Sequence, residues 1–315
     1  MNVLITGITG MVGSHFAIST RKEGWKTWGV ARFSASSRLA AIDDEFVIRC
    51  DITDRQQLGQ VFKKINPDIV VHMAAQAFNG ISWSMENMTH STNCLGTLNV
   101  LQCVKEYSPE AKVLLACSSA EYGDVAPEDC PIVEDRVLRP ITPYGVSKLA
   151  TEALGYQYYK NYGTKVYFPR MFIHVGTGHP PATAIQNFAR QLALIARGKL
   201  EPVLKVGNLL SARDFIDVRD GVAAMMLLLK NGEPGVPVNI ATGTAHSIGD
   251  TLRMLIGASG LDVSVKEDQS LMRLGDEPLL LANISRLKAL GWKQEFTFQE
   301  TLNAVFEDWL ARSNV

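Results

Sequence analysis

The 315-residue sequence predicts an α/β protein in which a doubly wound parallel sheet is followed by a smaller α+β lobe. Two observations predict this fold class. Short, β-branched apolar runs alternate with longer segments of helical period through the first half of the chain. Beyond residue 170 this alternation loosens, and glycine and proline concentrate in 176–181 and 232–237. We therefore expect one domain over residues 1–168 and a second over 169–315, from which some segments return to the first.

The expected helices of the first half are each long enough to carry a right-handed crossover between parallel strands. Asp54 and Thr142 can each cap the helix that follows, and Pro143 suits a first helical position. We expect strands over residues 2–6, 26–31, 46–50, 69–73, 112–117 and 165–171, and helices over residues 11–24, 55–65, 92–107, 143–162, 183–197 and 217–230.

Charge and composition exclude several classes of partner. Lysine and arginine total 31 against 32 acidic residues, and the formal net charge is −1 with no long run of either sign. A nucleic-acid or anionic-membrane partner would require a basic surface that this balance does not provide. The apolar runs are too short for a membrane span. We expect a small-molecule partner, with no nucleic acid and no membrane.

The cysteines and histidines point to a reducing compartment without a metal centre. The five cysteines form no Cys-x-x-Cys pair, and the N-terminus lacks the basic region of a secretory signal. Both features predict a cytoplasmic protein. The six histidines show no spacing typical of metal ligands, so no metal site is expected.

A glycine-rich turn follows the first expected strand and opens the first helix. Its glycines are Gly7, Gly10 and Gly13, with Met11 and Val12 between them. Such a turn lets backbone N–H groups and the helix dipole approach a pyrophosphate, which a Cβ would prevent. The alternative is a plain glycine-rich turn. Because a strand precedes it and a helix follows it, we favour dinucleotide binding.

The end of the second expected strand indicates which dinucleotide binds. An NAD-specific protein usually presents an acid there to the ribose 2′-hydroxyl, whereas this chain presents Arg32. A guanidinium would pair with a 2′-phosphate, which predicts NADP(H), with NAD(H) as the alternative. An exposed basic loop without a ligand would look the same. Asp51 is a candidate acceptor for the adenine amino group, or else a turn residue. Hydroxyls and a second arginine follow Arg32 at Ser34, Ser36, Ser37 and Arg38.

A tyrosine and a lysine four residues apart are candidates for acid/base chemistry. Tyr144 and Lys148 share one face at the start of the helix over 143–162. An ammonium beside a phenol stabilises the phenolate and helps the phenol to exchange a proton near neutral pH. Tyr156 and Lys160 repeat the spacing deeper in the same helix, where we expect a structural role.

Taken together, these residues resemble the extended short-chain dehydrogenase/reductase family. The resemblance implies a Rossmann domain with a C-terminal nucleotide-sugar lobe, and a catalytic triad of Ser118, Tyr144 and Lys148, with Ser119 assisting. It also implies cofactor contacts from Ile52, Ala74, Ala75, Gln76, Asn93 and Lys148. The motifs that carry it are the glycine turn, His72-Met73-Ala74-Ala75-Gln76, Asn93, Ser118-Ser119-Ala120-Glu121-Tyr122-Gly123 and Pro143-Tyr144-Gly145-Val146-Ser147-Lys148.

Five further segments narrow the resemblance: residues 76–83, 170–176, 207–209, 213–220 and 273–278. They resemble the GDP-mannose branch of this family, which contains 4,6-dehydratases and 4-keto reductases. The resemblance implies that Arg213 and Arg273 hold a diphosphate, as a guanidinium fork can. Surface or interdomain ion pairs are the alternative for both arginines. Ser119, Trp83 and His174 are the other expected substrate contacts.

Two departures from the branch bear on the reaction. Dehydratases of the branch place a glutamate, as an additional acid/base, where this chain has Ala120, which weakens the dehydratase interpretation. Glu121 is adjacent, but a shift of one residue at a strand end points a side chain elsewhere. Ile173 replaces a usual asparagine that binds the nucleotide sugar, so a related hexose or heptose is an open alternative.

The expected function is the NADP(H)-dependent reduction of the C4 keto group of a GDP-4-keto-6-deoxyhexose. The alternatives are a GDP-mannose 4,6-dehydratase, a related nucleotide-sugar 4-epimerase or dehydrogenase, and a non-catalytic NADP-sensing protein. The resemblance also implies a homodimer that pairs the helices over 92–107 and 143–162. Leu149, Leu154 and Tyr158 are the apolar residues expected at that interface, although they could equally pack on the chain's own sheet.

Overall fold

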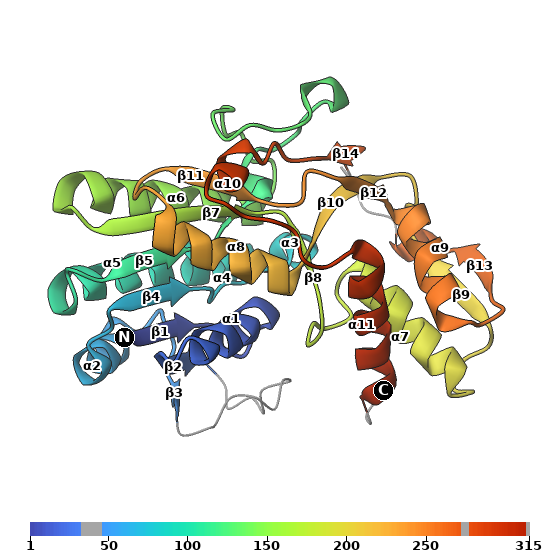
Figure 1. Cartoon of the computed structure of the whole chain (residues 1–315), viewed down its shortest axis with the longest axis horizontal. Helices are drawn as coiled ribbons and strands as arrows, with labels where there is room; N and C mark the ends of the chain where they lie inside the picture. The colour runs from blue at the N-terminus through green and yellow to red at the C-terminus, as the bar shows by residue number, and fades with distance from the viewer. Residues whose placement is uncertain (33–45, 272–276, 313–315) are drawn as a thin grey trace.

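The computed structural model describes residues 1–32, 46–271 and 277–312. The elements from β1 to α6 gather around one parallel sheet, while α7, α9 and α11 gather in a separate group beside it (Figure 1). The doubly wound α/β fold class expected from the sequence is confirmed.

The main sheet has eight strands, and all its pairings are parallel. Its order is β11-β7-β5-β4-β1-β2-β3, with β6 also paired to β7. Successive side chains of β1 enter different cores: Val3 and Ile5 belong to one buried cluster and Leu4 to another, as the twofold period of a strand requires. The strands are β1 Asn2–Thr6, β2 Lys26–Ala31, β3 Val47–Arg49, β4 Ile69–His72, β5 Lys112–Leu115, β6 Cys117–Ser118, β7 Lys165–Met171 and β11 Pro237–Ile240.

Helices cover both faces of this sheet. One core holds side chains of α1 and α8, and the other holds side chains of α2, α5 and α6. Asp54 caps α2 and Thr142 caps α6, as the sequence predicts. The bounds are α1 Met11–Lys22, α2 Arg55–Ile65, α5 Gly96–Tyr107, α6 Pro143–Tyr162 and α8 Val218–Asn231, with the short helices α3 Asn79–Ser82 and α4 Glu86–His90 after β4.

The second group of elements is smaller and mixed. Helices α7, α9 and α11 pack on one another around a third buried cluster. β10 lies between β12 and β14 and also pairs β8, while β9 pairs β13. The helices are α7 Ala184–Ala196, α9 Ile248–Ser259, α10 Ser285–Ala289 and α11 Phe298–Ala311. The strands are β8 Ile173–Val175, β9 Val203–Val206, β10 Ala212–Asp217, β12 Ala245–Ser247, β13 Ser264–Glu267 and β14 Leu279–Leu280.

Most expected elements are found with ends shifted by at most two residues, and two elements differ more. The expected strand over 112–117 is interrupted at Ala116, so that β6 pairs only with β7. The expected helix over 92–107 begins with a π-helical turn, Ser91–Leu95. Past residue 168, α8 packs against α1, and β11 extends the main sheet beside β7.

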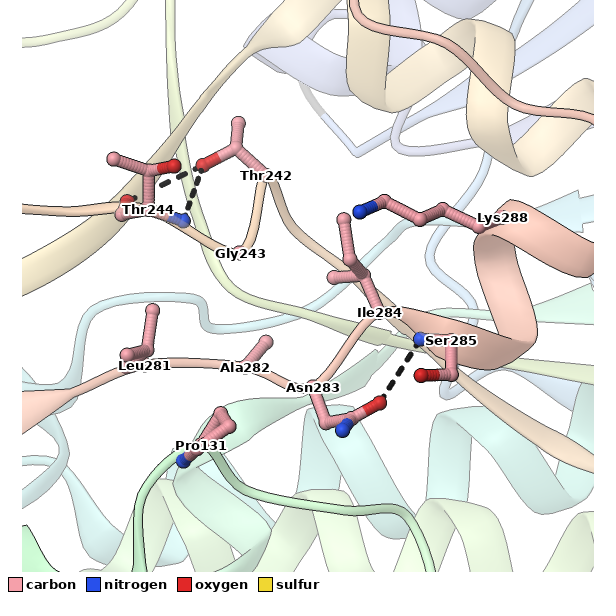
Figure 2. Close-up of a pocket in the computed structure, with 10 residues that line it drawn as sticks. All are labelled: Pro131, Thr242, Gly243, Thr244, Leu281, Ala282, Asn283, Ile284, Ser285 and Lys288. Atoms are coloured by element: carbon pink, nitrogen blue, oxygen red, sulfur yellow. Dashed lines mark hydrogen bonds between the residues drawn. The ribbon is translucent and has the colours of Figure 1, made fainter.

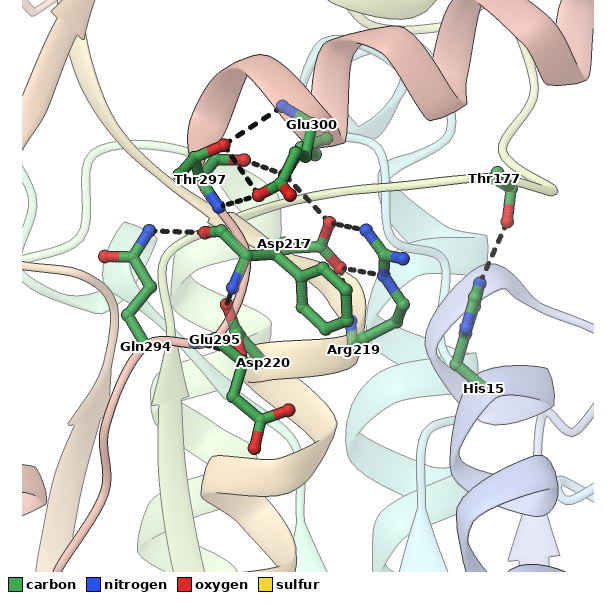
Figure 3. Close-up of polar contacts among 11 residues, drawn as sticks. His15, Thr177, Asp217, Arg219, Asp220, Gln294, Glu295, Thr297 and Glu300 are labelled. Atoms are coloured by element: carbon green, nitrogen blue, oxygen red, sulfur yellow. Dashed lines mark hydrogen bonds and ion pairs between the residues drawn. The ribbon is translucent and has the colours of Figure 1, made fainter.

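Buried carboxylates join the two groups of elements at the start of α8 (Figure 3). Asp217 caps α8 through the N–H of Arg219 and accepts the hydroxyl of Thr301 from α11 at 2.8 Å. Asp220 accepts the backbone N–H groups of Glu295 and Phe296, both at 3.1 Å. These bonds therefore fix the position of helix α11 relative to α8, which packs on the main sheet.

No helix of the described residues combines the length and the apolar character that crossing a bilayer requires.

Candidate active site

The glycine turn after β1 is shaped for a close backbone approach. Gly7 has φ of +70°, and a Cβ there would lie 2.7 Å from the backbone nitrogen of Ala74. A Cβ on Gly13 would lie 2.3 Å from the carbonyl oxygen of Gly7. Gly10 starts α1 without a side-chain cap, and Met11 and Val12 form the helix's first turn. The first N–H groups of α1 are thus available to an anion, and the turn fits a dinucleotide.

A buried histidine ties this turn to the loop after β4. Nδ1 of His72 lies 2.7 Å from Oγ1 of Thr6, and Nε2 lies 3.0 Å from Oγ1 of Thr97. The Thr97 hydroxyl donates to the carbonyl of Asn93 and the Thr6 hydroxyl accepts from the N–H of Ala74. We therefore assign the proton to Nε2, because only that tautomer satisfies both hydroxyls. Burial, aided by the charge of Lys148, lowers the pKa of His72 to about 3, so the ring is neutral.

Asn93 joins the loop after β4 to helix α6. Its side chain accepts the N–H of Gln76 at 2.8 Å and donates to the Gln76 carbonyl and to Oγ of Ser147, the latter at 2.8 Å. Asn93 lies in the π-helical turn, a local distortion that is frequent at functional sites. It and Gln76 are buried, whereas Ala74 and Ala75 are partly exposed. The asparagine therefore acts here by shaping the expected cofactor loop.

Three residues of this scaffold have no role assigned to them from the sequence: Thr6, Thr97 and Ser147. Each is a small hydroxyl residue one or a few positions from a recognised motif residue. Such residues become identifiable only when the partners they bond are known, since the bonds from Thr6 and Ser147 span 66 and 54 residues.

Tyr144 and Lys148 stand one turn apart at the start of α6. Nζ of Lys148 lies 5.9 Å from the centre of the Tyr144 ring and donates to the carbonyl of Ala116 at 2.6 Å. That carbonyl belongs to the interruption between β5 and β6. The lysine is buried while the tyrosine is partly exposed. The break in the expected strand thus supplies the acceptor that orients the lysine.

Ser118 ends β6 beside the start of α6. Its Oγ accepts the N–H of Ala120 at 3.2 Å, which leaves the hydroxyl proton free to be donated elsewhere. The backbone N–H of Ser118 donates to Oε1 of Glu121 at 2.7 Å. Gly145 lets α6 press against this turn, because a Cβ there would lie 2.5 Å from the Ala120 carbonyl oxygen. Ser119 is buried in the same turn. The fold therefore gathers the three expected catalytic residues around one strand end.

The expected substrate contacts are spread over several elements. Trp83 follows α3 and is 64% exposed. Arg213 on β10 is buried, donates to the carbonyl of Glu277 at 2.6 Å and lies 3.7 Å from its carboxylate. Arg273 lies outside the described residues. Arg213 thus forms an ion pair with Glu277, as in the ion-pair alternative to diphosphate binding.

His174 is enclosed by the junction of β8 and α8. Its Nδ1 lies 3.0 Å from the carbonyl oxygen of Phe172, and a Cβ on Gly221 would lie 2.2 Å from its Nε2. Burial lowers the pKa of His174 to about 4. The structure therefore packs this ring against α8, because Gly221 leaves space for it there. Its neighbour Ile173 is partly exposed.

The residues expected at the adenosine end lie at the edges of β2 and β3. Arg32 follows β2 and is exposed. Oδ1 of Asp51 accepts both the N–H and the hydroxyl of Thr53, so this oxygen serves a turn. Ile52 is buried against α5, where a Cβ on Gly96 would meet it. Outside the described residues lie Ser34, Ser36, Ser37 and Arg38.

A separate pocket of about 300 Å³ contains none of the expected site residues (Figure 2). Asp214 supports it by accepting the N–H and hydroxyl of Thr242 and the N–H groups of Gly243 and Ala282. Its lining is Pro131, Thr242, Gly243, Thr244, Leu281, Ala282, Asn283, Ile284, Ser285 and Lys288.

The chain is an extended short-chain dehydrogenase/reductase of the class that contains nucleotide-sugar enzymes. The features that define this class here are the glycine turn, the parallel sheet and the set of Ser118, Tyr144 and Lys148. Residues 4–305 match the family model described as GDP-mannose 4,6 dehydratase. The chain belongs to that family.

Among its relatives, the GDP-6-deoxy-D-mannose reductase of Pseudomonas aeruginosa is 30% identical, over 98% of this chain and 97% of that protein. The GDP-mannose 4,6-dehydratase of Yersinia enterocolitica is 27% identical, over 94% of this chain and 90% of that protein. The family thus includes relatives with two different reactions.

Solved structures share the whole fold. RMD from Pseudomonas aeruginosa, complexed with NADPH, has a TM-score of 0.87 at 30% identity, with 99% of both chains covered. The UDP-glucose 4-epimerase of Thermus thermophilus, in complex with NAD, has a TM-score of 0.89 at 27% identity, also with 99% of both chains covered.

Proposed function

We propose that the protein is an NADP(H)-dependent reductase of the C4 keto group of a GDP-4-keto-6-deoxyhexose. The observation that carries this choice within the family is the turn after Ser118. Ala120 has no acid/base group, and the neighbouring Glu121 is fully buried with its carboxyl on the Ser118 backbone N–H. Elimination of water from a sugar needs an additional acid/base at the substrate, whereas reduction of a ketone does not. The reductase relative at 30% identity supports the same choice.

The site's own residues account for the proton and for carbonyl polarisation. The free hydroxyl proton of Ser118 is donated to the C4 oxygen, which polarises the carbonyl. NADPH bound at the glycine turn supplies the hydride that forms the new C–H bond. Tyr144 gives its phenolic proton to the same oxygen, so that ketone, hydride and proton become an alcohol. Lys148 stabilises the resulting phenolate, which regains a proton from solvent.

The choice of NADP(H) is supported by Arg32 at the end of β2, where an NAD-specific protein usually has an acid. A relative of known structure is complexed with NADPH. NAD(H) is the alternative, because the epimerase of similar fold is in complex with NAD. We also infer that the diphosphate of the sugar nucleotide is held by Arg213 and Arg273, with Ser119 and Trp83 on the sugar side. On binding, Arg213 exchanges the Glu277 contact for the ligand.

The test compares two reactions of the purified protein. NADPH absorbance should fall with GDP-4-keto-6-deoxymannose, and GDP-mannose with NADP should give no 4-keto product. A 4-keto product in the second reaction, with no NADPH consumed in the first, would instead establish a dehydratase. Without turnover in either reaction, tight NADPH binding would favour the sensing protein.

We further propose a homodimer formed by α5 and α6. The interface residues expected from sequence need correction: Tyr158 is buried in the chain's own core and Leu154 packs against it, because both face the sheet. The exposed apolar residues on these helices are instead Val146, Tyr156 and Tyr162, with Leu95 just before α5. Light scattering should give a mass twice that of one chain for the wild type, and the mass of a single chain for Tyr156→Glu. A wild-type monomer would contradict the proposal.

A cytoplasmic location is proposed from the cysteines, all five of which are free. Cell fractionation tests it, and recovery with an exported fraction would refute it.

A further inference from the structure

A buried polar cluster adjoins Ser118 through the backbone N–H of that residue. Arg170 of β7 donates twice to the carboxylate of Glu152 of α6, at 2.8 and 2.6 Å. The same guanidinium donates to the Tyr122 hydroxyl and the Glu134 carbonyl. Both oxygens of Glu152 therefore accept from one guanidinium in a bidentate pair.

Glu121 faces this pair with one oxygen unaccounted for. Oε1 accepts the backbone N–H of Ser118 at 2.7 Å. Oε2 is buried and has no hydrogen-bond partner among the described residues, and Arg170 approaches it only to 3.9 Å. Oxygens of Glu121 and Glu152 and Sγ of Cys117 all lie within 4.8 Å of one another.

Counting charges resolves this arrangement. Two ionised carboxylates beside one guanidinium would leave a net negative charge in a buried cluster, where solvation is costly to replace. A proton on Oε2 removes that charge and makes the partnerless atom a donor toward Glu152, while Oε1 still accepts from Ser118. Burial and the neighbouring Glu152 carboxylate both raise the pKa of Glu121 well above its usual value.

The groups facing Glu121 come from three elements: Cys117 from β6, Glu152 from α6 and Arg170 from β7. Burial raises the pKa of the Cys117 thiol well above its usual value, so it adds no charge. Tyr122 and Glu134 lie beyond Arg170, and desolvation raises the pKa of Tyr122 as well.

We propose that Glu121 is a neutral carboxylic acid that shares its proton with Glu152 and thereby positions Ser118 for reaction. The inference rests on the proposed function, since it concerns the Ser118 hydroxyl as donor to the substrate oxygen. Tyr144, Lys148 and Glu152 recur every four residues and so lie along one face of α6. The helix that carries the phenol and the ammonium therefore also holds, through Glu121, the strand end that carries the hydroxyl.

The test compares Glu121→Gln with Glu121→Leu. Glutamine can accept the Ser118 N–H with its carbonyl and donate to Glu152 with its amide, so we expect it to retain most of the wild-type kcat. Leucine can do neither, and we expect kcat to fall by up to about 100-fold through misplacement of Ser118, with the Kd for NADPH unchanged. Equal loss in both variants, or full activity in the leucine variant, would overturn the positioning role.

Infrared spectroscopy tests the proton without using turnover. The wild-type protein should show the C=O stretch of a buried carboxylic acid near neutral pH, and Glu121→Gln should lack it. Glu152→Gln should also lose the band, because Glu121 then ionises beside Arg170. Absence of the band in the wild type would refute the neutral acid. Wild-type inactivity toward the keto sugar, or full activity of Ser118→Ala, would instead count against the proposed function while the band still reports on Glu121.

Discussion

Two tyrosines of α6 stand four residues before a lysine, and their exposure separates them. Tyr144 lies beside Ser118 and the buried Lys148, whereas Tyr156 is 48% exposed, with Lys160 5.5 Å from its ring centre. Tyr144→Phe should lower kcat by about 100- to 10,000-fold, because the proton donor is lost, while the Kd for NADPH stays the same. Tyr156→Phe is the matched control and should retain kcat. Near-normal turnover of Tyr144→Phe would remove this residue from the mechanism.

Arg32 allows a second prediction at the scale of one side chain. If its guanidinium pairs with the 2′-phosphate, Arg32→Ser should raise the Kd for NADPH by about 10- to 100-fold and leave that for NADH unchanged. Fluorescence titration of both cofactors measures this. Arg253→Ser, on the exposed face of α9, should change neither constant. Equal weakening of both cofactors by Arg32→Ser would mean that Arg32 does not read the phosphate.

Residue roles could be predicted where a motif fixes both the residue type and its element. Ser118 at a strand end and Tyr144 and Lys148 at a helix start are of this kind. Glu121 and Arg170 are not, because their significance lies in contacts with residues distant in sequence: the bonds from Arg170 span 18 to 48 residues. The packing of the His174 ring against Gly221 is likewise a contact with a distant helix that no local pattern reveals.

At the scale of elements, the glycine turn and helix α1 act as one unit. Gly13→Ala should weaken NADPH binding by at least about tenfold, since a Cβ 2.3 Å from the Gly7 carbonyl oxygen must displace the start of α1. Gly257→Ala is the matched control: its Cβ meets nothing within 4 Å, and it lies exposed in α9. That variant should bind NADPH normally and be stabilised by up to about 1 kcal/mol. Normal NADPH binding by Gly13→Ala would contradict the pyrophosphate role of this turn.

Element bounds could be predicted wherever local signals are complete. α2 and α6 occupy the expected residues because Asp54, Thr142 and Pro143 act within the chain segment itself. The break at Ala116 and the π-helical turn at Ser91–Leu95 could not, because their partners come from elsewhere: Lys148 bonds the Ala116 carbonyl, and Asn93 bonds Gln76 and Ser147. Both irregularities lie at the candidate active site, where function rather than local propensity determines the backbone.

For the whole molecule, the order of strands sets where the site lies. β1, β4 and β6 all end at the same edge of a parallel sheet, so the glycine turn, the loop after β4 and Ser118 meet there. α8 and β11 pack on this sheet although they follow it by many residues. Their attachment depends on tertiary pairing, and the same helix start anchors α11 through Asp217. Loss of the bond between Asp217 and Thr301 should therefore weaken the packing of both groups of elements.

Acid should destabilise the folded molecule through three histidines whose pKa values are lowered by folding. Folding lowers the pKa of His72 from 6.5 to about 3 and that of His174 to about 4, and it also lowers that of His15. Between these values the unfolded chain binds more protons than the folded one. The stability they contribute is therefore complete above pH 6.5 and is lost progressively as the pH falls toward 3. Glu121, Asp214 and Asp220 have raised pKa values and act in the opposite sense.

A difference measurement isolates the part due to His72. Near pH 7.5, His72→Gln should lower the free energy of unfolding by about 1–3 kcal/mol, because glutamine cannot bond both Thr6 and Thr97. Below pH 6.5 the unfolded wild type binds a proton at His72 that the folded wild type excludes, and the variant has no such group. The difference between the two free energies of unfolding should therefore narrow by about 1.4 kcal/mol per pH unit. Urea unfolding of both proteins at a series of pH values measures this difference. A difference that stays constant down to about pH 4.5 would mean that His72 is not held neutral by the fold.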